Sequence, residues 1–329
     1  MRVGILSFAH LHAEGYVQNL RAIPDVELLG FYDPDPERRR RFSEAFNLRA
    51  FEELEDLLAL GLDAAVVTAE NARHRPLVEA AARAGAAVLV EKPIATTVED
   101  ALAMQEAVRA AGVPFMTAFP MRFSPAVRTA REMVGEGALG PVRAIVGVNH
   151  SENPKRHRAW FADPELAGGG AVMDHTVHLA DLYRWILGEE VAEVYAEVQN
   201  PFDPEGAVDT AGLLLLRTEG GVRASIDASW SRPPNYPRWG HLWMEIVGER
   251  GTLVLDAFAG HLHLWSPAGY RWYGFHPDPA QGMMEAFIES VREGREPPVT
   301  WEDGFEAMRV ALAAYRSAAT GRPVAPRVY

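Results

Sequence analysis

The alternation of short apolar runs with helical stretches in the first 120 residues limits the possible fold more than any other feature of this chain. Five apolar runs predict buried parallel strands, at residues 3–6, 26–32, 64–68, 86–90 and 114–118. Stretches with a period near 3.6 residues separate them, at residues 13–22, 36–46, 54–60, 73–84 and 98–111. Gly61, Gly85 and Gly112 follow three of these stretches, where a left-handed helix cap is expected. The pattern predicts βαβ units and a doubly wound parallel sheet.

The remainder of the chain has a different pattern. Longer alternating strands are expected at residues 142–149, 192–199, 210–217, 222–229, 243–247 and 252–256. Helices are expected at residues 126–136, 171–187, 284–293 and 304–320. Residues 149–170 are predicted to be an irregular loop, and a loop of this length is usually functional. We predict an α/β protein with a Rossmann-type domain at 1–120 and an α+β domain, with a mostly antiparallel open sheet, at 121–329.

Composition excludes several classes of function. The 329 residues are 48% hydrophobic and 23% charged, as in ordinary globular proteins. The absence of cysteine excludes disulfides, thiolate catalysis and cysteine-ligated metals. A net charge of −13 argues against nucleic acid or an anionic membrane as the main partner. No secretory signal or membrane span is recognisable, so a cytoplasmic location is expected.

The turn after the first strand lacks the usual dinucleotide-binding glycines. Where such folds have G-x-G-x-x-G, this chain has Ser7-Phe8-Ala9-His10-Leu11-His12. Ser7 and Ala9 are small enough for a pyrophosphate to approach, whereas His12 replaces the glycine that allows close packing of helix on strand. Asp33 ends the second strand, where a carboxylate binds the adenosine ribose and favours NAD over NADP. The alternative is that Asp33 only caps the following helix.

The pair His10-x-His12 also permits a metal-dependent hydrolase. Hydrolases built on a (β/α) barrel have such a pair after the first strand, and Asp174, His175 and His178, with His150, could complete a metal site. A barrel needs βα repetition along the whole chain, and the second half does not show it.

Lys92 is the first candidate catalytic residue. It lies in Glu91-Lys92-Pro93, directly after the fifth strand, at the edge where open α/β sheets bind ligands. Lys92 and Lys155 are the two lysines among 32 basic residues, so a lysine here suggests that arginine would not serve. A compact ammonium group can lie beside a reacting oxygen and lose its proton. The alternative is that this lysine is incidental.

A second candidate cluster follows a run of three glycines. Gly168-Gly169-Gly170 would let the backbone approach a ligand or another chain closely. In the helix that follows, Asp174, His178 and Asp181 share one face, so Asp174 can orient His178 as a general base. The alternative is that His178 packs into a core, with Asp174 as its hydrogen-bonding partner.

These motifs together resemble the glucose–fructose oxidoreductase, inositol dehydrogenase and MocA family over nearly the whole chain. The resemblance rests on Glu91-Lys92-Pro93, Arg122-Phe123-Ser124-Pro125, the glycine run with Asp174 and His178, and the segments MEIVGERGTLVLD and AAYRSAATGRPV. It implies an NAD-dependent oxidoreductase that moves a hydride between nicotinamide and a secondary hydroxyl of a sugar, inositol or related polyol. It also implies a homodimer or homotetramer that assembles through the open sheet.

The resemblance assigns roles residue by residue. Lys92 would stabilise the reacting oxygen, His178 would take its proton, and Asp174 would orient His178 or bind substrate. The cofactor would contact the first turn (Ser7, Phe8, Ala9, His10), Asp33, Thr68, Asn71, His74 and Glu91. The substrate would contact Arg122, His157, Arg158, Trp160 and His175. No metal belongs to this set. A non-catalytic binding protein of the same fold is the remaining alternative, because the turn departs from the family pattern.

Overall fold

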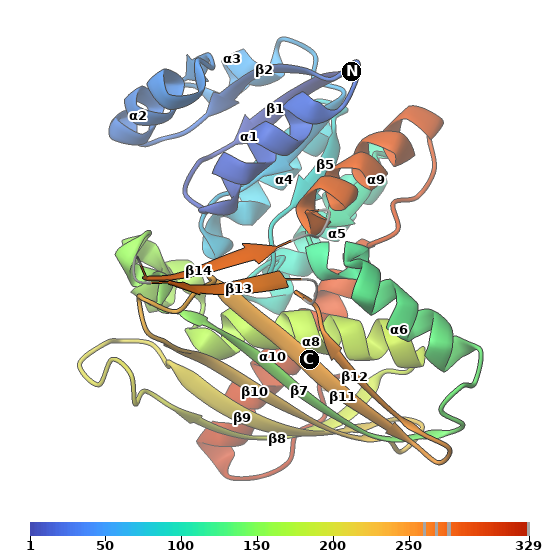
Figure 1. Cartoon of the computed structure of the whole chain (residues 1–329). Helices are drawn as coiled ribbons and strands as arrows, with labels where there is room; N and C mark the ends of the chain where they lie inside the picture. The colour runs from blue at the N-terminus through green and yellow to red at the C-terminus, as the bar shows by residue number, and fades with distance from the viewer. Residues whose placement is uncertain (259–260, 267–268, 275–277, 328–329) are drawn as a thin grey trace. The chain divides into compact units, whose positions relative to one another are not determined.

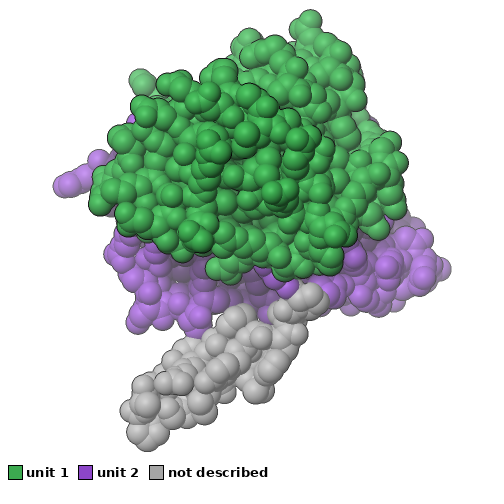
Figure 2. Space-filling view, turned by 90° about the horizontal axis from the view of Figure 1, so that it is seen from above, with its two compact units in different colours: residues 1–119, 165–168, 280–305 green, residues 120–164, 169–279, 306–329 purple. Residues whose placement is uncertain are grey.

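The computed structural model describes residues 1–258, 261–266, 269–274 and 278–327, and the chain forms two compact units (Figure 1). The first unit consists of Met1–Phe119, Glu165–Gly168 and Ala280–Phe305, and the second of Pro120–Pro164, Gly169–Pro279 and Glu306–Tyr329. Figure 2 colours the first unit green and the second purple. The sequence-based boundary after residue 120 stays a prediction, and Ala280–Phe305 lies in the first unit.

The first unit contains a six-stranded parallel sheet in the order β3-β2-β1-β4-β5-β6. Its strands are β1 (Arg2–Leu6), β2 (Glu27–Tyr32), β3 (Ala50–Phe51), β4 (Ala64–Val67), β5 (Ala87–Val90) and β6 (Phe115–Thr117). All residues of β4 and β5 are buried, as expected for strands covered on both faces. The strand order reverses between β1 and β4, which makes the carboxyl end of β1 the switch point where such sheets bind ligands.

Local signals explain the helices of this unit. They are α1 (His12–Ala22), α2 (Pro36–Phe46), α3 (Leu54–Leu58), α4 (His74–Arg83), α5 (Val98–Ala111) and α9 (Pro279–Glu293). Helix α2 begins at Pro36 because the Asp35 carboxylate accepts hydrogen bonds from the amides of Glu37 and Arg38. Gly85 and Gly112 have φ angles of +79° and +65°, which confirms the left-handed caps predicted after α4 and α5.

The second unit contains a six-stranded sheet in the order β12-β11-β7-β10-β9-β8. Its strands are β7 (Val142–Glu152), β8 (Val191–Gln199), β9 (Ala211–Thr218), β10 (Arg223–Arg232), β11 (Gly240–Gly248) and β12 (Thr252–Asp256). The pair β7–β10 is parallel and the other pairs are antiparallel, so the predicted, mostly antiparallel sheet is confirmed. The remaining helices are α6 (Pro125–Gly135), α8 (Ala171–Leu187) and α10 (Trp301–Thr320).

Helix α8 covers one face of this sheet. The Tyr183 hydroxyl donates to the Ser225 carbonyl oxygen at 2.8 Å, and a Cβ atom on Gly147 would lie 2.0 Å from that hydroxyl. Glycine at position 147 therefore lets the helix lie close on β7. On the opposite face, Val146, Leu215 and Val254 lie in one row across the sheet and are 41%, 55% and 59% exposed.

Three features differ from the sequence-based expectation. The prediction of an irregular loop at residues 149–170 is wrong, because β7 continues to Glu152 and three short helical segments follow it. These segments are η3 (Pro154–Arg156), η4 (Ala159–Ala162) and α7 (Pro164–Ala167). The short strand β3 and the hairpin of β13 (His261–Ser266) with β14 (Gly269–Gly274) were not predicted.

No helix in the described part of the chain combines the length and apolar character that a membrane span requires.

Candidate active site

The turn between β1 and α1 contains no glycine, but its first residue has the left-handed conformation found in dinucleotide-binding turns. Ser7 has a φ of +80°, the left-handed conformation that a glycine supplies with least strain. Its amide donates to the Tyr32 carbonyl oxygen at 2.7 Å, and its own carbonyl oxygen accepts from Thr68 Oγ1 at 2.6 Å. Such a conformation costs roughly 1–3 kcal/mol, so it persists because surrounding bonds hold it. Serine thus replaces the first glycine of the turn.

Asp33 is fully buried at the end of β2, and its carboxylate already has several donors. It accepts from the Ser7 hydroxyl at 3.1 Å, from the Phe8 amide at 2.7 Å and from the Asp35 amide at 2.9 Å. Arg38 Nε also donates to both carboxylate oxygens, at 2.9 and 3.1 Å. A ribose hydroxyl would therefore reach this carboxylate only if Arg38 turned away, because a carboxylate accepts about four hydrogen bonds.

The donor set of this region fits a dinucleotide. An acid ends β2, the turn is left-handed at Ser7, and α1 has no side-chain cap from its N-cap residue Leu11. A helix N-terminus at this position binds pyrophosphate oxygens. The guanidinium of Arg38 lies beside the acid, and an arginine there can accommodate a 2′-phosphate. The charge argument for NAD over NADP is consequently weaker than Asp33 alone suggests.

Glu91 and Lys92 lie at the carboxyl end of β5, and both are buried. Glu91 Oε1 lies 2.9 Å from His12 Nδ1 and accepts a short hydrogen bond from Tyr16, while Oε2 accepts from the Lys92 amide at 3.1 Å. Burial by itself would raise the pKa of Glu91. The charges of His10, His12 and Lys92 and the bond to His12 outweigh burial, and they hold that pKa well below its usual range.

The other residues expected along the cofactor form bonds within the first unit. The Asn71 side chain donates to the Ala167 carbonyl oxygen at 2.9 Å. The two ring nitrogens of His74 lie 3.0 and 3.2 Å from the carbonyl oxygens of Ile94 and Ala69. Burial lowers the pKa of His74 even though these carbonyl groups and nearby carboxylates raise it. His74 therefore connects two loops, and its contact with a cofactor stays a prediction.

In the second unit, the carboxylate of Asp174 lies beside His175 and Trp230. Its Oδ2 is 3.2 Å from His175 Nε2 and accepts from Trp230 Nε1 at 3.2 Å. His175 is buried, and its Nδ1 lies 2.8 Å from the Asn149 carbonyl oxygen. Trp230 was not among the predicted site residues, because nothing in the local sequence relates β10 to the start of α8.

The face of α8 that carries Asp174, His178 and Asp181 forms as predicted, within a helix whose bounds match the expectation. His178 is half-buried, and its orientation by Asp174 stays a prediction. Asp181 is paired with Arg122 in a buried bidentate contact, with distances of 2.9 Å to Nε and 2.5 Å to Nη2. This pairing positions the Arg122 guanidinium, whose predicted contact with substrate remains a prediction.

The glycine run has a structural explanation within the second unit. A Cβ atom on Gly170 would lie 1.8 Å from the Asp209 carbonyl oxygen, and one on Gly169 would lie 2.2 Å from the Tyr315 hydroxyl. The Asp209 carboxylate also accepts from the amides of Gly170 and Val172, both at 2.8 Å. The close approach predicted for a ligand or another chain is therefore, at these two glycines, an approach of the chain to itself.

Comparison with known proteins identifies the family. Residues 1–119 match the oxidoreductase family with an NAD-binding Rossmann fold, and residues 127–254 match the GFO/IDH/MocA C-terminal domain. The chain belongs to the GFO/IDH/MocA oxidoreductase family. Myo-inositol dehydrogenase Hyg17 of Streptomyces leeuwenhoekii is 30% identical over 322 residues, which cover 94% of this chain and 96% of that protein. Myo-inositol 2-dehydrogenase of Thermotoga maritima is 28% identical over 98% of both chains.

A solved structure supports the same assignment. The structure of GenD2 from gentamicin A biosynthesis, in complex with NAD, has a TM-score of 0.89 and 25% identity, and the match covers 99% of this chain and 96% of that one. Membership of the GFO/IDH/MocA family confirms the predicted oxidoreductase class and the nicotinamide cofactor. The alternative interpretation as a barrel hydrolase is wrong, because the first sheet is open, with β3 and β6 as its edges.

The remaining predicted substrate contacts lie after β7, with His157 and Arg158 between η3 and η4 and Trp160 in η4. Trp160 is buried and stacks on Phe161 with ring centroids 3.9 Å apart. His157 is exposed and meets the ring of Trp239 edge-on at 5.0 Å. Arg158 Nη1 donates to the His157 carbonyl oxygen at 3.0 Å. Their contacts with a substrate stay predictions.

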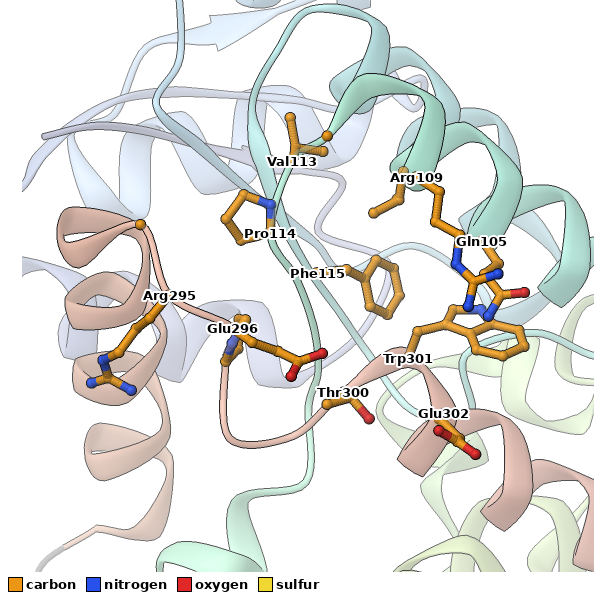
Figure 3. Close-up of a pocket in the computed structure, with 14 residues that line it drawn as sticks. Gln105, Arg109, Val113, Pro114, Phe115, Arg295, Glu296, Thr300, Trp301 and Glu302 are labelled. Atoms are coloured by element: carbon orange, nitrogen blue, oxygen red, sulfur yellow. The ribbon is translucent and has the colours of Figure 1, made fainter.

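The first unit also contains a cavity of about 530 Å³ (Figure 3). Residues from α5, from the start of β6 and from the segment around Trp301 line it. Arg109, Phe115 and Glu296 are among the side chains that Figure 3 labels. None of the predicted site residues lines this cavity, so it is not part of the candidate active site.

Proposed function

We propose that the protein transfers a hydride between NAD and a secondary hydroxyl of a sugar, an inositol or a related polyol. The observation that carries this proposal is the position of Lys92. It is 4% exposed, directly follows β5, and lies in a unit of the NAD-binding Rossmann family. Relatives named as myo-inositol dehydrogenases support the substrate class. A small hydroxylated molecule is accordingly the partner we expect.

Three residues of this chain would each have a separate role in hydride transfer. Bound NAD supplies the acceptor for the hydride. The ammonium of Lys92 donates a hydrogen bond to the reacting oxygen and stabilises its developing negative charge. His178 takes the hydroxyl proton as general base. Asp174, which is held by Trp230 Nε1, orients an imidazole or binds a substrate hydroxyl.

Substrate and cofactor contacts complete the proposal. The first turn, Asp33 and Arg38 would hold the adenosine half of NAD. The substrate would be bound by polar groups and one aromatic ring, namely Arg122, His157, Arg158, Trp160 and His175. These side chains suit a polyol, since they offer donors, acceptors and an apolar face.

Assembly and location belong to the same proposal. The exposed face of the second sheet carries Val146, Leu213, Leu215 and Val254, and an exposed apolar patch of this kind marks an interaction surface. We propose that it joins copies of this chain as a homodimer or homotetramer. The cytoplasmic location expected from the sequence stays a prediction.

The proposal is tested in two steps on the purified full chain. NADH and NADPH are first titrated into the protein and binding is followed by fluorescence, with saturable binding expected. Myo-inositol, scyllo-inositol and a set of aldoses are then offered with NAD, and the rise in NADH absorbance is recorded. Binding without turnover of any polyol would favour the non-catalytic alternative. Failure of folded protein to bind either dinucleotide would overturn the proposal.

A further inference from the structure

Three metal-ligating side chains meet at the carboxyl edge of the first sheet. His10 and His12 come from the β1–α1 turn, and Glu91 from the end of β5. One ligand atom from each residue lies within 4.8 Å of the other two. The imidazole rings of His10 and His12 are 4.3 Å apart, at an interplanar angle of 61°. Their sequence spacing first suggested a barrel hydrolase, and the open sheet gives the pair a different carboxylate partner.

We propose that His10, His12 and Glu91 bind one divalent transition-metal ion, for which Zn²⁺ is the best match. Two imidazoles and one carboxylate are a donor set that suits zinc. Three protein ligands leave a fourth tetrahedral position open. His12 lines the accessible side, because its side chain is 32% exposed whereas those of His10 and Glu91 are 2% and 0% exposed.

The ligand atoms are already directed at one another. His12 Nδ1 lies 2.9 Å from Glu91 Oε1, and His10 Nδ1 lies 3.9 Å from the same oxygen. His10 Nδ1 accepts a hydrogen bond from the His12 amide at 3.2 Å, so it is unprotonated, and a metal ion would displace that amide from its lone pair. A bound cation would take the place of the proton shared by His12 and Glu91.

Burial explains why a cation is favourable here. Glu91 has no solvent exposure, and a buried carboxylate is costly unless a positive charge or several donors accompany it. The Tyr16 hydroxyl and the Lys92 amide donate to this carboxylate and fix its orientation. Outer hydrogen bonds of this kind are what orient carboxylate ligands in metal sites. The site goes beyond the proposed dehydrogenase activity, and it shares His10 and Glu91 with the residues proposed to contact the cofactor.

The test measures metal binding without cofactor or substrate. The full chain is treated with EDTA, dialysed, and titrated with Zn²⁺ by calorimetry, and Co²⁺ is added separately to record its visible absorption. We expect one Zn²⁺ per chain, with a Kd of about 1 µM or lower, and the absorption of a four-coordinate cobalt site. Fewer than about 0.1 ions per chain would overturn the proposal and leave a cluster held by shared protons.

Variants locate the site and separate binding from folding. His12→Gln keeps a donor for Glu91 but is a poor zinc ligand, so it should weaken Zn²⁺ binding about 100-fold with an unchanged melting temperature. Glu91→Gln should weaken binding similarly. His157→Ala removes an exposed imidazole elsewhere and should bind as the wild type does. Equal affinity in wild type and His12→Gln would place the ion at another site and refute the assignment. NADH titration of the metal-free wild type and of His157→Ala, in which the cluster is intact, reports separately on the dehydrogenase proposal.

Discussion

At the scale of single residues, polar side chains stabilise a turn that contains glycines in most dinucleotide-binding folds. Ser7 takes the left-handed conformation, and the buried carboxylate of Asp33 accepts from the Ser7 hydroxyl and the Phe8 amide. Arg38 then neutralises Asp33 at 2.9 Å. The amides of Ser7, Phe8, Ala9 and His10 accordingly all donate to acceptors within the first unit.

Lys92 provides the most direct test of the chemistry. We expect Lys92→Ala to lower kcat/KM by about 100- to 1,000-fold, as removal of a donor to a developing oxyanion does. NADH affinity should be unchanged, because the ammonium acts on the substrate oxygen. Steady-state kinetics and NADH titration make the measurement. Lys155→Ala is the matched control, since Lys155 is half-exposed in a surface ion pair with Asp203. Full activity of Lys92→Ala would disprove the assigned role.

Arg38 should decide how well the protein tolerates NADPH. Arg38→Gln removes the guanidinium beside Asp33, so we expect NADPH affinity to fall by about 10- to 100-fold, because one bond to a charged group contributes about 1.5–3 kcal/mol. NADH affinity should stay level or improve. Fluorescence titration of both cofactors gives the ratio. Arg40→Gln, an exposed position on the same helix, controls for net charge. Equal losses for both cofactors would mean that Arg38 only orders Asp33.

At the scale of elements, the start of α8 is fixed by contacts that lie far away in the sequence. The carboxylate of Asp209 accepts from the Gly170 and Val172 amides, and the Tyr315 hydroxyl donates to Asp209 at 2.6 Å. Burial and the Asp209 charge raise the pKa of the Tyr315 hydroxyl well above its usual value, so it remains a donor. Asp174 and His178 are carried on the helix that these contacts anchor.

Gly170 tests this anchoring. A Cβ atom there would lie 1.8 Å from a backbone oxygen, so Gly170→Ala should lower the free energy of unfolding by about 3 kcal/mol. Chemical denaturation gives the value. Gly135→Ala in α6 is the control, because nothing lies within 4 Å of a Cβ atom there, and alanine should be neutral or stabilising. If Gly170→Ala were as stable as the wild type, the backbone of Asp209 would have to move far enough to accommodate the added Cβ atom.

At the scale of the whole molecule, the residues with predicted roles are divided between the two units. The first unit holds the cofactor turn, Glu91 and Lys92, and the second holds Asp174 and His178. On the exposed face of the second sheet, Val254, Val146 and Leu215 lie in one cross-strand row, in which they alternate with Glu245 and Ser225. Assembly of copies through this face would bury that row, which is the physical reason to expect an oligomer.

A charge placed in this row should change the oligomeric state. Leu215 is 55% exposed, and we expect Leu215→Glu to yield monomers with unchanged secondary structure, because pairing would bury the carboxylate. Light scattering after size-exclusion chromatography measures the mass. Leu102→Glu, at a 47% exposed leucine on α5, should leave the oligomer intact. A monomeric wild type would contradict the proposed interface.

The sequence by itself determined most of the longer helices and strands and the positions of the main motifs. Helices α2, α5 and α8 have the predicted bounds, because periodicity, caps and left-handed glycines act within a few residues. The same local signals placed Lys92 at the end of a parallel strand, and Asp174 and His178 on one helix face. The motifs distributed along the chain were together sufficient to identify the family.

Tertiary structure alone decided which groups meet. Arg38 covers Asp33, His175 and Trp230 lie beside Asp174, and His12 lies beside Glu91. Trp230 and Asp174 come from different elements, as do His12 and Glu91, so no periodicity within one segment encodes these contacts. Arg38 and His175 are close to their partners in the sequence, but only the fold shows that the side chains meet. The glycine run shows the same difference, because its sequence predicts a close approach but only the fold identifies Asp209 and Tyr315 as what is approached. Burial then gives these contacts their strength, since a charge or strained backbone persists only where the packed chain supplies its partners.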